Sequence, residues 1–286
     1  MIDKFNAAID SGDENDAQRE IDTIAVDADC GRYQVAAQRR LAALRLSAAQ
    51  LLMARGRPVE DFDRLLTAAE SPQVLWQASA TLGEVQFGAR HFSDAALAFD
   101  RAIEIVKNET RTPIAPTKSE INELLERAAQ ARLLAANVPN SPHSEKFVKT
   151  ARDQRDGRLG GLYSQSVRGI VPRAIPVPIT FEYRKTDFTD VGHDAAGELL
   201  TAIKEQNPAR MVLVGHTDVR GSAEVNMKLS VARAEAVAAF LHQNGIVIPI
   251  ETIGKGANEP MHLSDPSGLS QEDIYALNRR VEWIRE

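Results

Sequence analysis

The 286-residue sequence lacks several features that would assign it to a particular class of protein. Cys30 is its only cysteine, so no disulfide can form within the chain. No apolar run approaches the ~20 residues of a membrane-spanning helix. The first residues, MIDKFNAAIDSGDEN, have neither the basic start nor the apolar core of a signal peptide. The net charge of -6 disfavours nucleic acid as a partner, because phosphate binding favours a basic surface.

The motifs of a catalytic, cofactor or metal site are also missing. The turn GHTDVRG, residues 215–221, lacks the Gly-Lys-Ser/Thr ending of a phosphate-binding loop. His216 and Asp218 could share a metal, but a protein site needs three or four ligands, and no HExxH or paired HxH is present. No nucleophile stands beside a base held by a third group. We therefore expect no enzyme activity, no cofactor and no metal, and interpret His216 as a strand-end histidine bonded to backbone.

The first half of the chain has a helical composition. Residues 1–136 are rich in Ala, Leu, Arg, Glu and Gln and poor in β-branched runs. Within 79–102, small and large residues fall as in a tetratricopeptide (TPR) unit, which this stretch resembles: Leu82, Gly83, Ala95, Phe99 and Ala102. A TPR unit repeats about every 34 residues. The matching positions one period earlier are Ala48, Ala49, Asp61, Leu65 and Ala68, of which Asp61 does not fit. We expect an all-α domain of TPR-like repeats, closed by a helix over 117–136 that Thr117 and Glu120 cap.

Residues 137–172 change in character and predict a linker. This stretch carries Pro, Ser, Gly and mixed charge, with a short helix expected over 144–154. The two halves are expected to fold separately on either side of it.

The period changes again from Arg173 onward. Apolar and polar residues alternate over 175–181, as in a half-buried strand. Further strands are expected over 211–214, 248–254 and 279–284, and helices over 190–206 and 222–244. A single helical turn, which Ser270 and Asp273 would cap, is expected in the loop 257–277. The predicted fold class is therefore an all-α domain, 1–136, followed by a βαβαββ domain with a mixed sheet, 173–286.

The helix expected to begin at Ser222 is predicted to bury one apolar stripe. Its members recur at helical spacing and are Val225, Leu229, Ala232, Ala236 and Phe240.

Five sequence elements, in order, connect the second domain to a known family. They are GHTDVRG, then Asn226, then Leu229-Ser230-x-x-Arg233-Ala234, then Gly256 with Pro260, and finally Asn278-Arg279-Arg280-Val281-Glu282. This order resembles the OmpA C-terminal family, which also includes MotB and the peptidoglycan-associated lipoproteins. The resemblance covers about 173–286. It implies an OmpA-like fold and non-catalytic binding of bacterial peptidoglycan.

The resemblance places the family's Asp/Arg pair on Asp218 and Arg233. Stem peptides in most Gram-negative bacteria contain meso-diaminopimelate, whose side chain ends in an ammonium and a carboxylate. Asp218 is expected to take the ammonium, and Arg233 the carboxylate with its planar guanidinium. Spacing alone leaves open whether the two residues meet, because Arg233 lies ~16 Å along the helix from Ser222. Ala232 stands where the family often has a second arginine.

Four further residues are candidates for contact with peptidoglycan. Thr217 and Asn226 are expected either to bond the ligand or to brace the loop. Arg220 is expected either to reach a wall carboxylate or to face water. Arg280 is interpreted mainly as a residue that holds the last strand, with contact to the wall as the alternative.

The leading functional hypothesis is a non-catalytic protein of the periplasm or cell envelope, associated with the outer membrane. It would bind peptidoglycan through diaminopimelate, while its helical domain holds a second envelope protein or spaces the anchor from it. Such a protein needs a leader or lipid anchor, which we expect to precede this chain; the alternative explanation for the missing signal peptide is a cytoplasmic protein. The alternative is a TPR-type adaptor in which the OmpA-like domain is only structural. A wall-modifying enzyme would need a nucleophile or metal set that the sequence lacks.

Overall fold

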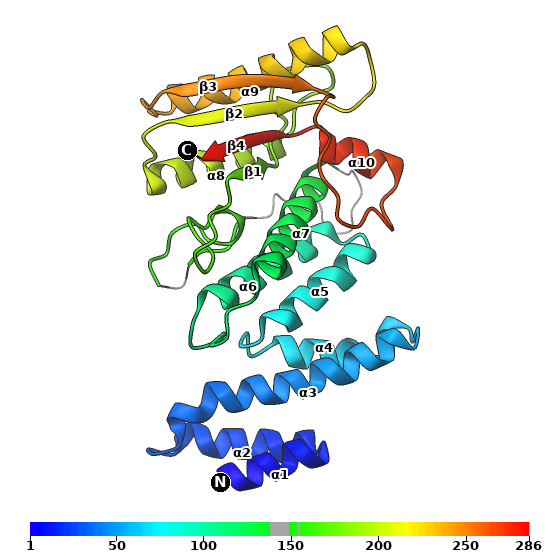
Figure 1. Cartoon of the computed structure of the whole chain (residues 1–286), viewed down its shortest axis with the longest axis vertical. Coiled ribbons are helices and arrows are strands. Elements are labelled where there is room, and N and C mark those ends of the chain that lie inside the picture. Colours follow the sequence, from blue (N-terminus) through cyan, green and yellow to red (C-terminus); the bar gives the residue numbers. More distant parts are fainter. Residues whose placement is uncertain (138–148, 154, 286) are drawn as a thin grey trace.

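Within residues 1–137, antiparallel helices stack along the long axis of the molecule (Figure 1). The computed structural model describes residues 1–137, 149–153 and 155–285. The helices of the stack are α1 (Ile2–Ser11), α2 (Glu14–Val26), α3 (Gln34–Ala54), α4 (Asp63–Glu70), α5 (Trp76–Gly88), α6 (Phe92–Lys107) and α7 (Lys118–Asn137). The all-α character expected of this half is confirmed.

The TPR-like repeat itself is not confirmed. In the pair α5/α6, Gly83 faces Phe99 so closely that a Cβ on Gly83 would lie 2.7 Å from the ring. In the pair α3/α4, Ala49 is buried as expected. The buried residues of α4, however, are Leu66 and Ala69, each one position beyond the expected residue. Because α3 has 21 residues and α4 only 8, the two pairs are not copies of one unit.

The start of α7 agrees with its predicted cap. The backbone N–H of Thr117 donates to Glu120 Oε2 at 2.7 Å, and the Glu120 N–H donates to Thr117 Oγ1 at 3.3 Å. These reciprocal bonds satisfy donors that the first turn leaves without partners.

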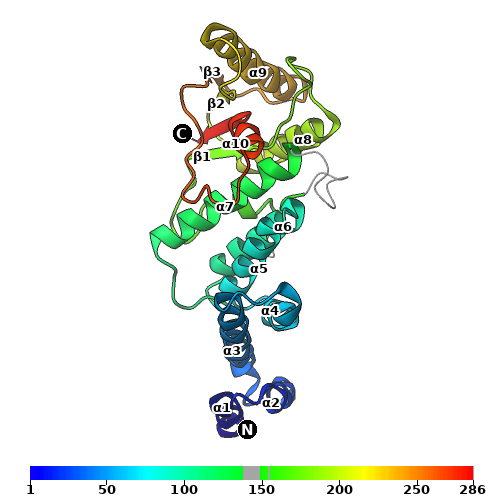
Figure 2. The ribbon, with the colours of Figure 1, turned by 90° about the vertical axis from the view of Figure 1, so that its right-hand side faces the viewer.

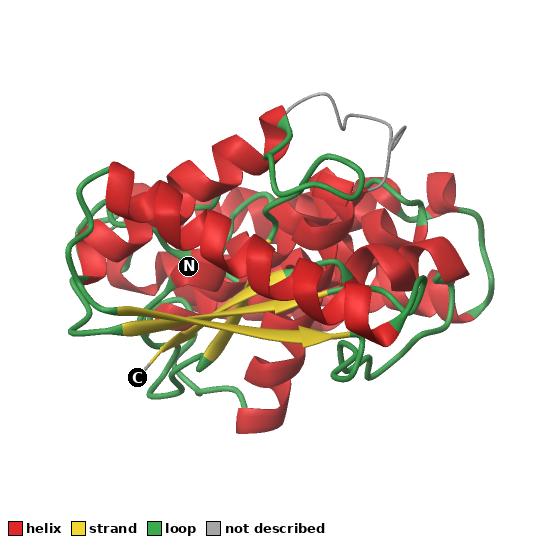
Figure 3. Cartoon of the chain, turned by 90° about the horizontal axis from the view of Figure 1, so that it is seen from above, coloured by secondary structure: helices red, strands yellow, loops and turns green. Residues whose placement is uncertain are grey.

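The second half is a mixed four-stranded sheet, as predicted. Its strands are β1 (Ala174–Val177), β2 (Met211–His216), β3 (Ile250–Gly256) and β4 (Val281–Arg285), in the order β1-β4-β2-β3. β2 and β3 are parallel, and β4 is antiparallel to both β1 and β2. Seen from above, the strands form one layer covered by helices (Figure 3). The helices of this half are α8 (Asp190–Gln206), α9 (Ala223–Gln243) and α10 (Gln271–Asn278).

Side-chain caps start each of these helices. Thr189, Ser222 and Ser270 accept hydrogen bonds from backbone N–H groups of the first turns. Ser270 and Asp273 complete the predicted capping box, although α10 runs for 8 residues rather than one turn.

The predicted buried stripe of α9 is wrong. Val225 is 52% exposed, and the other four members of that stripe are only half-buried. The buried residues of this helix are instead Asn226, Ser230, Arg233, Ala234, Val237, Ala238 and Leu241. Three of these residues are polar, so the spacing of apolar residues in the sequence did not identify the buried face of α9. The close approach of β2 also depends on Gly215, since a Cβ there would lie 2.0 Å from the Ser230 carbonyl oxygen.

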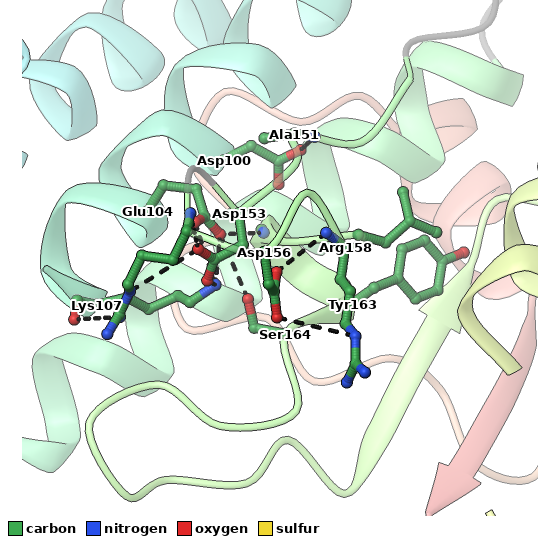
Figure 4. Close-up of polar contacts among 12 residues, drawn as sticks. Asp100, Glu104, Lys107, Ala151, Asp153, Asp156, Arg158, Tyr163 and Ser164 are labelled. Atoms are coloured by element: carbon green, nitrogen blue, oxygen red, sulfur yellow. Dashed lines mark hydrogen bonds and ion pairs between the residues drawn. The ribbon is translucent and has the colours of Figure 1, made fainter. Parts of the chain in front are cut away.

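The described part of 137–172 packs tightly against its neighbours. Tyr163 is 1% exposed. The Gly161 N–H donates to Glu104 Oε1 on α6 at 2.7 Å, and Lys107 pairs with Asp153 at 2.6 Å (Figure 4). The short helix expected over 144–154 lies mostly outside the described residues, and residues 149–153 are not helical. The domain boundaries at 136 and 173 stay a prediction.

One hydrophobic core continues from the helical stack into the sheet. It includes Phe87, Phe99 and Leu133 from α5, α6 and α7, and Val177 and Trp283 from the sheet. Helices α1 to α4 lie beyond it, with two smaller clusters around Ile21 and Leu66. The sheet and the N-terminus therefore lie at opposite ends of the molecule (Figure 2).

Candidate functional site

A pocket of about 910 Å³ opens where the 217–221 turn meets the start of α9. Five segments form its walls: that turn with α9, the segment after β1, the start of α8, α10 with Arg279, and the last turn of α7. Its lining includes Ala135, Ala136, Asn137, Thr180, Phe181, Tyr183, Arg184, Thr217, Asp218, Arg220, Asn226, Arg233, Glu272 and Arg279. The pocket thus brings together five of the six residues that the sequence singled out.

Asp218 is the most heavily bonded residue of the pocket. Its carboxylate accepts from Arg220 Nη2 at 2.6 Å and from Arg279 Nη1 at 2.9 Å. It also accepts from the Arg220 backbone N–H at 2.9 Å, which closes the turn. Burial raises the pKa of Asp218, but the bonds from Arg220 and Arg279 outweigh burial, and the pKa lies below its ordinary value. Asp218 is therefore a carboxylate at neutral pH.

Arg233 lies in the same pocket and forms no ion pair with any acidic residue that the structure describes. Its side chain packs over the Phe181 ring, with Cζ 4.8 Å from the ring centroid. Within the described residues its one hydrogen bond is from Nε to the Lys185 carbonyl oxygen, at 3.4 Å. Burial and the nearby charge of Arg279 lower the pKa of Arg233 to about 10, although Asp218 acts in the opposite direction. Over the described residues, the pocket therefore holds a buried cation without a directly bonded counter-ion.

Thr217 and Asn226 fix the turn. The Thr217 N–H donates to the Gly256 carbonyl oxygen at 2.9 Å, and Asn226 Nδ2 donates to the Asp218 carbonyl oxygen at 3.2 Å. The bracing role expected of Asn226 is thus present. Thr217 Oγ1 differs, because it is buried and has no hydrogen-bond partner among the described residues. A ligand in the pocket could satisfy this hydroxyl.

Arg220 bridges two acids rather than pointing to open water. Besides Asp218, its guanidinium lies 3.4 Å from Glu272 Oε2. The Arg220 side chain is 52% exposed, so solvent screens these pairs. Arg220 therefore occupies the side of Asp218 that a cationic ligand group would approach.

Arg280 does not line the pocket, whereas its neighbour Arg279 does. Arg280 Nε donates to Glu282 Oε1 at 2.7 Å, and its side chain is 5% exposed. This placement agrees with the strand-holding role expected of it. Arg279 was not predicted as a site residue, although the Arg279-Arg280 doublet was the available signal. Glu272 and the end of α7 were not predicted either, and no sequence motif marks them.

His216 is buried next to Glu282. Its Nε2 lies 3.6 Å from Glu282 Oε2, so the partner is a side chain and not the backbone group expected. Burial raises the pKa of Glu282, but His216 and Arg280 more than offset burial and lower it to about 2.

The described residues contain no cluster of metal ligands and no helix that could span a membrane. Residues 1–137, 149–153 and 155–285 hold no group of three or more His, Cys, Asp or Glu placed to bind a metal. Over the same ranges, every helix is too short or too polar to span a membrane.

Comparison with known families identifies the part of the chain that carries this pocket. Residues 180–272 match the model of the OmpA family, so this segment is an OmpA-family domain. The match includes Asp218 and Arg233 and ends before Arg279.

Curated relatives match the chain in part. A peptidoglycan-associated lipoprotein of Pseudomonas aeruginosa is 35% identical over 107 residues, which cover 36% of this chain and 61% of that protein. The photosystem I P700 chlorophyll a apoprotein A2 of Gloeobacter violaceus is 31% identical over 150 residues, which cover 52% of this chain but 17% of that protein. The chain thus spans 61% of the length of the first of these relatives and 17% of the second.

Among solved structures, the peptidoglycan-associated lipoprotein of Burkholderia pseudomallei is similar to this chain. It is 24% identical, with a TM-score of 0.33, over 40% of this chain and 91% of that one.

Proposed function

We propose that this chain is a non-catalytic peptidoglycan-binding protein of the cell envelope. It holds the diaminopimelate side chain of a stem peptide between Asp218 and Arg233. The observation that carries the proposal is the buried Arg233 guanidinium, which pairs directly with no acidic side chain among residues 1–137, 149–153 and 155–285. Burying a charge without a partner is unfavourable, so a carboxylate entering the pocket gains an interaction that the free protein lacks. The OmpA-family domain and the peptidoglycan-associated relatives support the same ligand.

The ligand's ammonium is proposed to bind Asp218. In the free protein, Arg220 and Arg279 both donate to this carboxylate. Arg220 is the exposed one of the pair and already lies near Glu272. On binding, Arg220 moves toward Glu272 and leaves one side of Asp218 to the ammonium, while Arg279 stays in place. Thr217 Oγ1, which has no partner among the described residues, donates to the ligand or accepts from it.

The helical half is proposed to set the distance between the wall and a partner in the envelope. Its far end offers a groove of about 700 Å³, lined by Glu14, Arg45 and Arg64 among others. The groove is lined by residues of α1 to α4 and the turns between them, and these helices lie at the opposite end of the molecule from the sheet (Figure 1). A partner bound there would be held away from the peptidoglycan.

Binding of purified sacculi by the full-length chain tests the proposal. Asp218→Ala and Arg233→Ala are each expected to weaken binding by about tenfold or more, because each leaves one ligand charge unpaired. The double variant is expected to lose less than the sum of the two, since both residues hold one side chain. Arg233→Lys is expected to recover binding only in part, because an ammonium cannot reproduce the planar guanidinium.

Asp156→Ala and Arg158→Ala provide matched controls. These residues form an exposed pair, 3.9 Å apart (Figure 4), and neither of them lines the pocket. Both controls should bind sacculi as the wild type does. Sacculi with lysine at the diaminopimelate position lack the carboxylate for Arg233 and should bind poorly. Equal binding of both wall types would rule out the mechanism.

A further inference from the structure

The helical half contributes a wall to the pocket of the OmpA-family domain. The last turn of α7, Ala135 to Asn137, lines the same pocket as Asp218 and Arg233. Ala136 is half-buried there. Asn137 Nδ2 donates to the Leu133 carbonyl oxygen at 2.8 Å, which ends the helix in an ordered turn. The pocket is therefore built from two regions that the sequence assigned to separate domains.

Polar contacts hold α7 in this position along its length. Arg132 is buried, is paired with Asp100 on α6, and lies 3.8 Å from Glu198 on α8. Six residues earlier, the Glu126 carboxylate accepts from the backbone N–H and the hydroxyl of Ser264, at 2.8 and 2.7 Å. Since the two contacts connect α7 to two different segments of the sheet domain, the end of the helix is fixed relative to the pocket.

The size of the pocket shows that it can accept more than the end of one side chain. Pockets of ~300–1,000 Å³ enclose most of a drug-sized ligand, and this one measures about 910 Å³. In the proposed binding mode, the charged end of diaminopimelate contacts residues of the 217–233 segment. The end of α7 and the segment around Tyr183 line other parts of the pocket, where a longer ligand would contact them. The methyl groups of Ala135 and Ala136 suit a small apolar side chain.

We infer that the last turn of α7 contacts the residues next to diaminopimelate in the stem peptide. The helical half is then part of the binding site, and the protein recognises a peptide rather than one zwitterionic side chain. The partner chemistry is a diaminopimelate residue followed by a small apolar residue such as alanine. This inference rests on the proposed function.

Two soluble probes separate the inference from the proposed function. They are free meso-diaminopimelate and the tetrapeptide L-Ala–D-Glu–meso-diaminopimelate–D-Ala, titrated against the full-length chain by calorimetry. The wild type should bind the tetrapeptide about tenfold or more tightly than the free amino acid, a difference of about 1.4 kcal/mol. Ala136→Trp places a large side chain at the α7 wall. It should weaken tetrapeptide binding about fivefold or more and change binding of the free amino acid less than about twofold.

Ala43→Trp, on an exposed face of α3, is the matched control and should bind both probes as the wild type does. Ala136→Leu is a smaller change at the same position and decides the question if Ala136→Trp does not fold. Unchanged tetrapeptide binding by a folded Ala136 variant would overturn the inference. Equal losses for both probes would also overturn it, because the α7 end would then act on the charged pair alone. A wild type that binds neither probe would instead overturn the proposed function.

Discussion

Arg90 and Asp273 are 183 positions apart and are joined by two hydrogen bonds, of 2.7 and 2.8 Å. Arg90 stands in the turn between α5 and α6, and Asp273 is the acid of the capping box that starts α10. The Asp273 side chain is 1% exposed. The residue before it, Glu272, lines the wall pocket. The helical half is thus bonded to the helix that carries one side of the candidate site.

Arg90→Ala is expected to destabilise the chain. Among the residues that the structure describes, the substitution leaves the buried Asp273 carboxylate with its capping bonds from Ser270 alone. Since the Arg90 side chain is 45% exposed, the loss should be about 1 kcal/mol, the lower end for a bond to a charged group. Urea unfolding measures it. Arg57→Ala, which breaks the local and exposed pair with Asp61, is the control, and an equal loss in both variants would contradict a special role for Arg90.

Arg233→Met is expected to raise stability while weakening wall binding. Arg233 is buried without an acidic partner among the described residues, and its pKa of about 10 means that folding disfavours its charged form. An apolar side chain of similar length removes that penalty and keeps the packing on Phe181. The free energy of unfolding should rise by roughly 1 kcal/mol, and sacculus binding should fall about tenfold or more. A variant that is both less stable and unable to bind would show that Arg233 serves the fold.

Glu282→Gln is expected to weaken the dependence of the free energy of unfolding on pH in the acidic range. Despite burial, His216 and Arg280 lower the pKa of Glu282 from 4.5 to about 2. A carboxylate with a lowered pKa in the folded state stabilises the protein above its unfolded pKa, and this contribution is lost as the pH falls toward 2. At pH 7 the variant should therefore be less stable, by on the order of 3 kcal/mol. The difference should shrink between pH 5 and about 2, as measured by urea unfolding at each pH. A difference that stays constant across this range would exclude the linkage.

Gly83→Ala is expected to strain the contact between α5 and α6. The added Cβ would meet the Phe99 ring at 2.7 to 2.9 Å, too close for a side-chain contact. Phe99 is buried in the continuous core and has little room to move, so the loss should be ~1–3 kcal/mol. Gly88→Ala, on the same helix with open space around its Cβ, is the control and should be neutral or slightly stabilising. Thermal unfolding compares the two variants. Equal melting temperatures would mean that the Phe99 ring moves aside to make room for the added Cβ.

The sequence predicted the elements that depend on local chemistry. Ser222, Thr189 and Thr117 begin helices because each side chain bonds the first turn of its own helix. The position of Asp218 in a tight turn followed from the glycines on both sides. Such features involve residues close in the chain, so a single sequence is enough to find them.

Features that depend on distant segments were missed. The buried face of α9 carries Asn226, Ser230 and Arg233, whose partners lie on other elements, so apolar spacing pointed to the wrong side of the helix. Arg279 and Arg280 are adjacent, and only the start of β4 decides which one enters the pocket. Tyr163 lay in a stretch with the composition of a linker, yet it is enclosed by α6, α7 and the sheet.

The separation of the apolar clusters gives the chain a graded response to mechanical load. The clusters around Ile21 and Leu66 hold α1 to α4 in small units, whereas one core extends from α5 to the sheet. A pull between the N-terminus and the sheet would act on these units in series, and the smaller ones should yield first. The far end of the molecule would then lengthen and absorb the strain while the pocket around Asp218 and Arg233 kept its shape. With peptidoglycan bound as proposed, the chain would behave as an extensible tether whose binding end is the last part to yield.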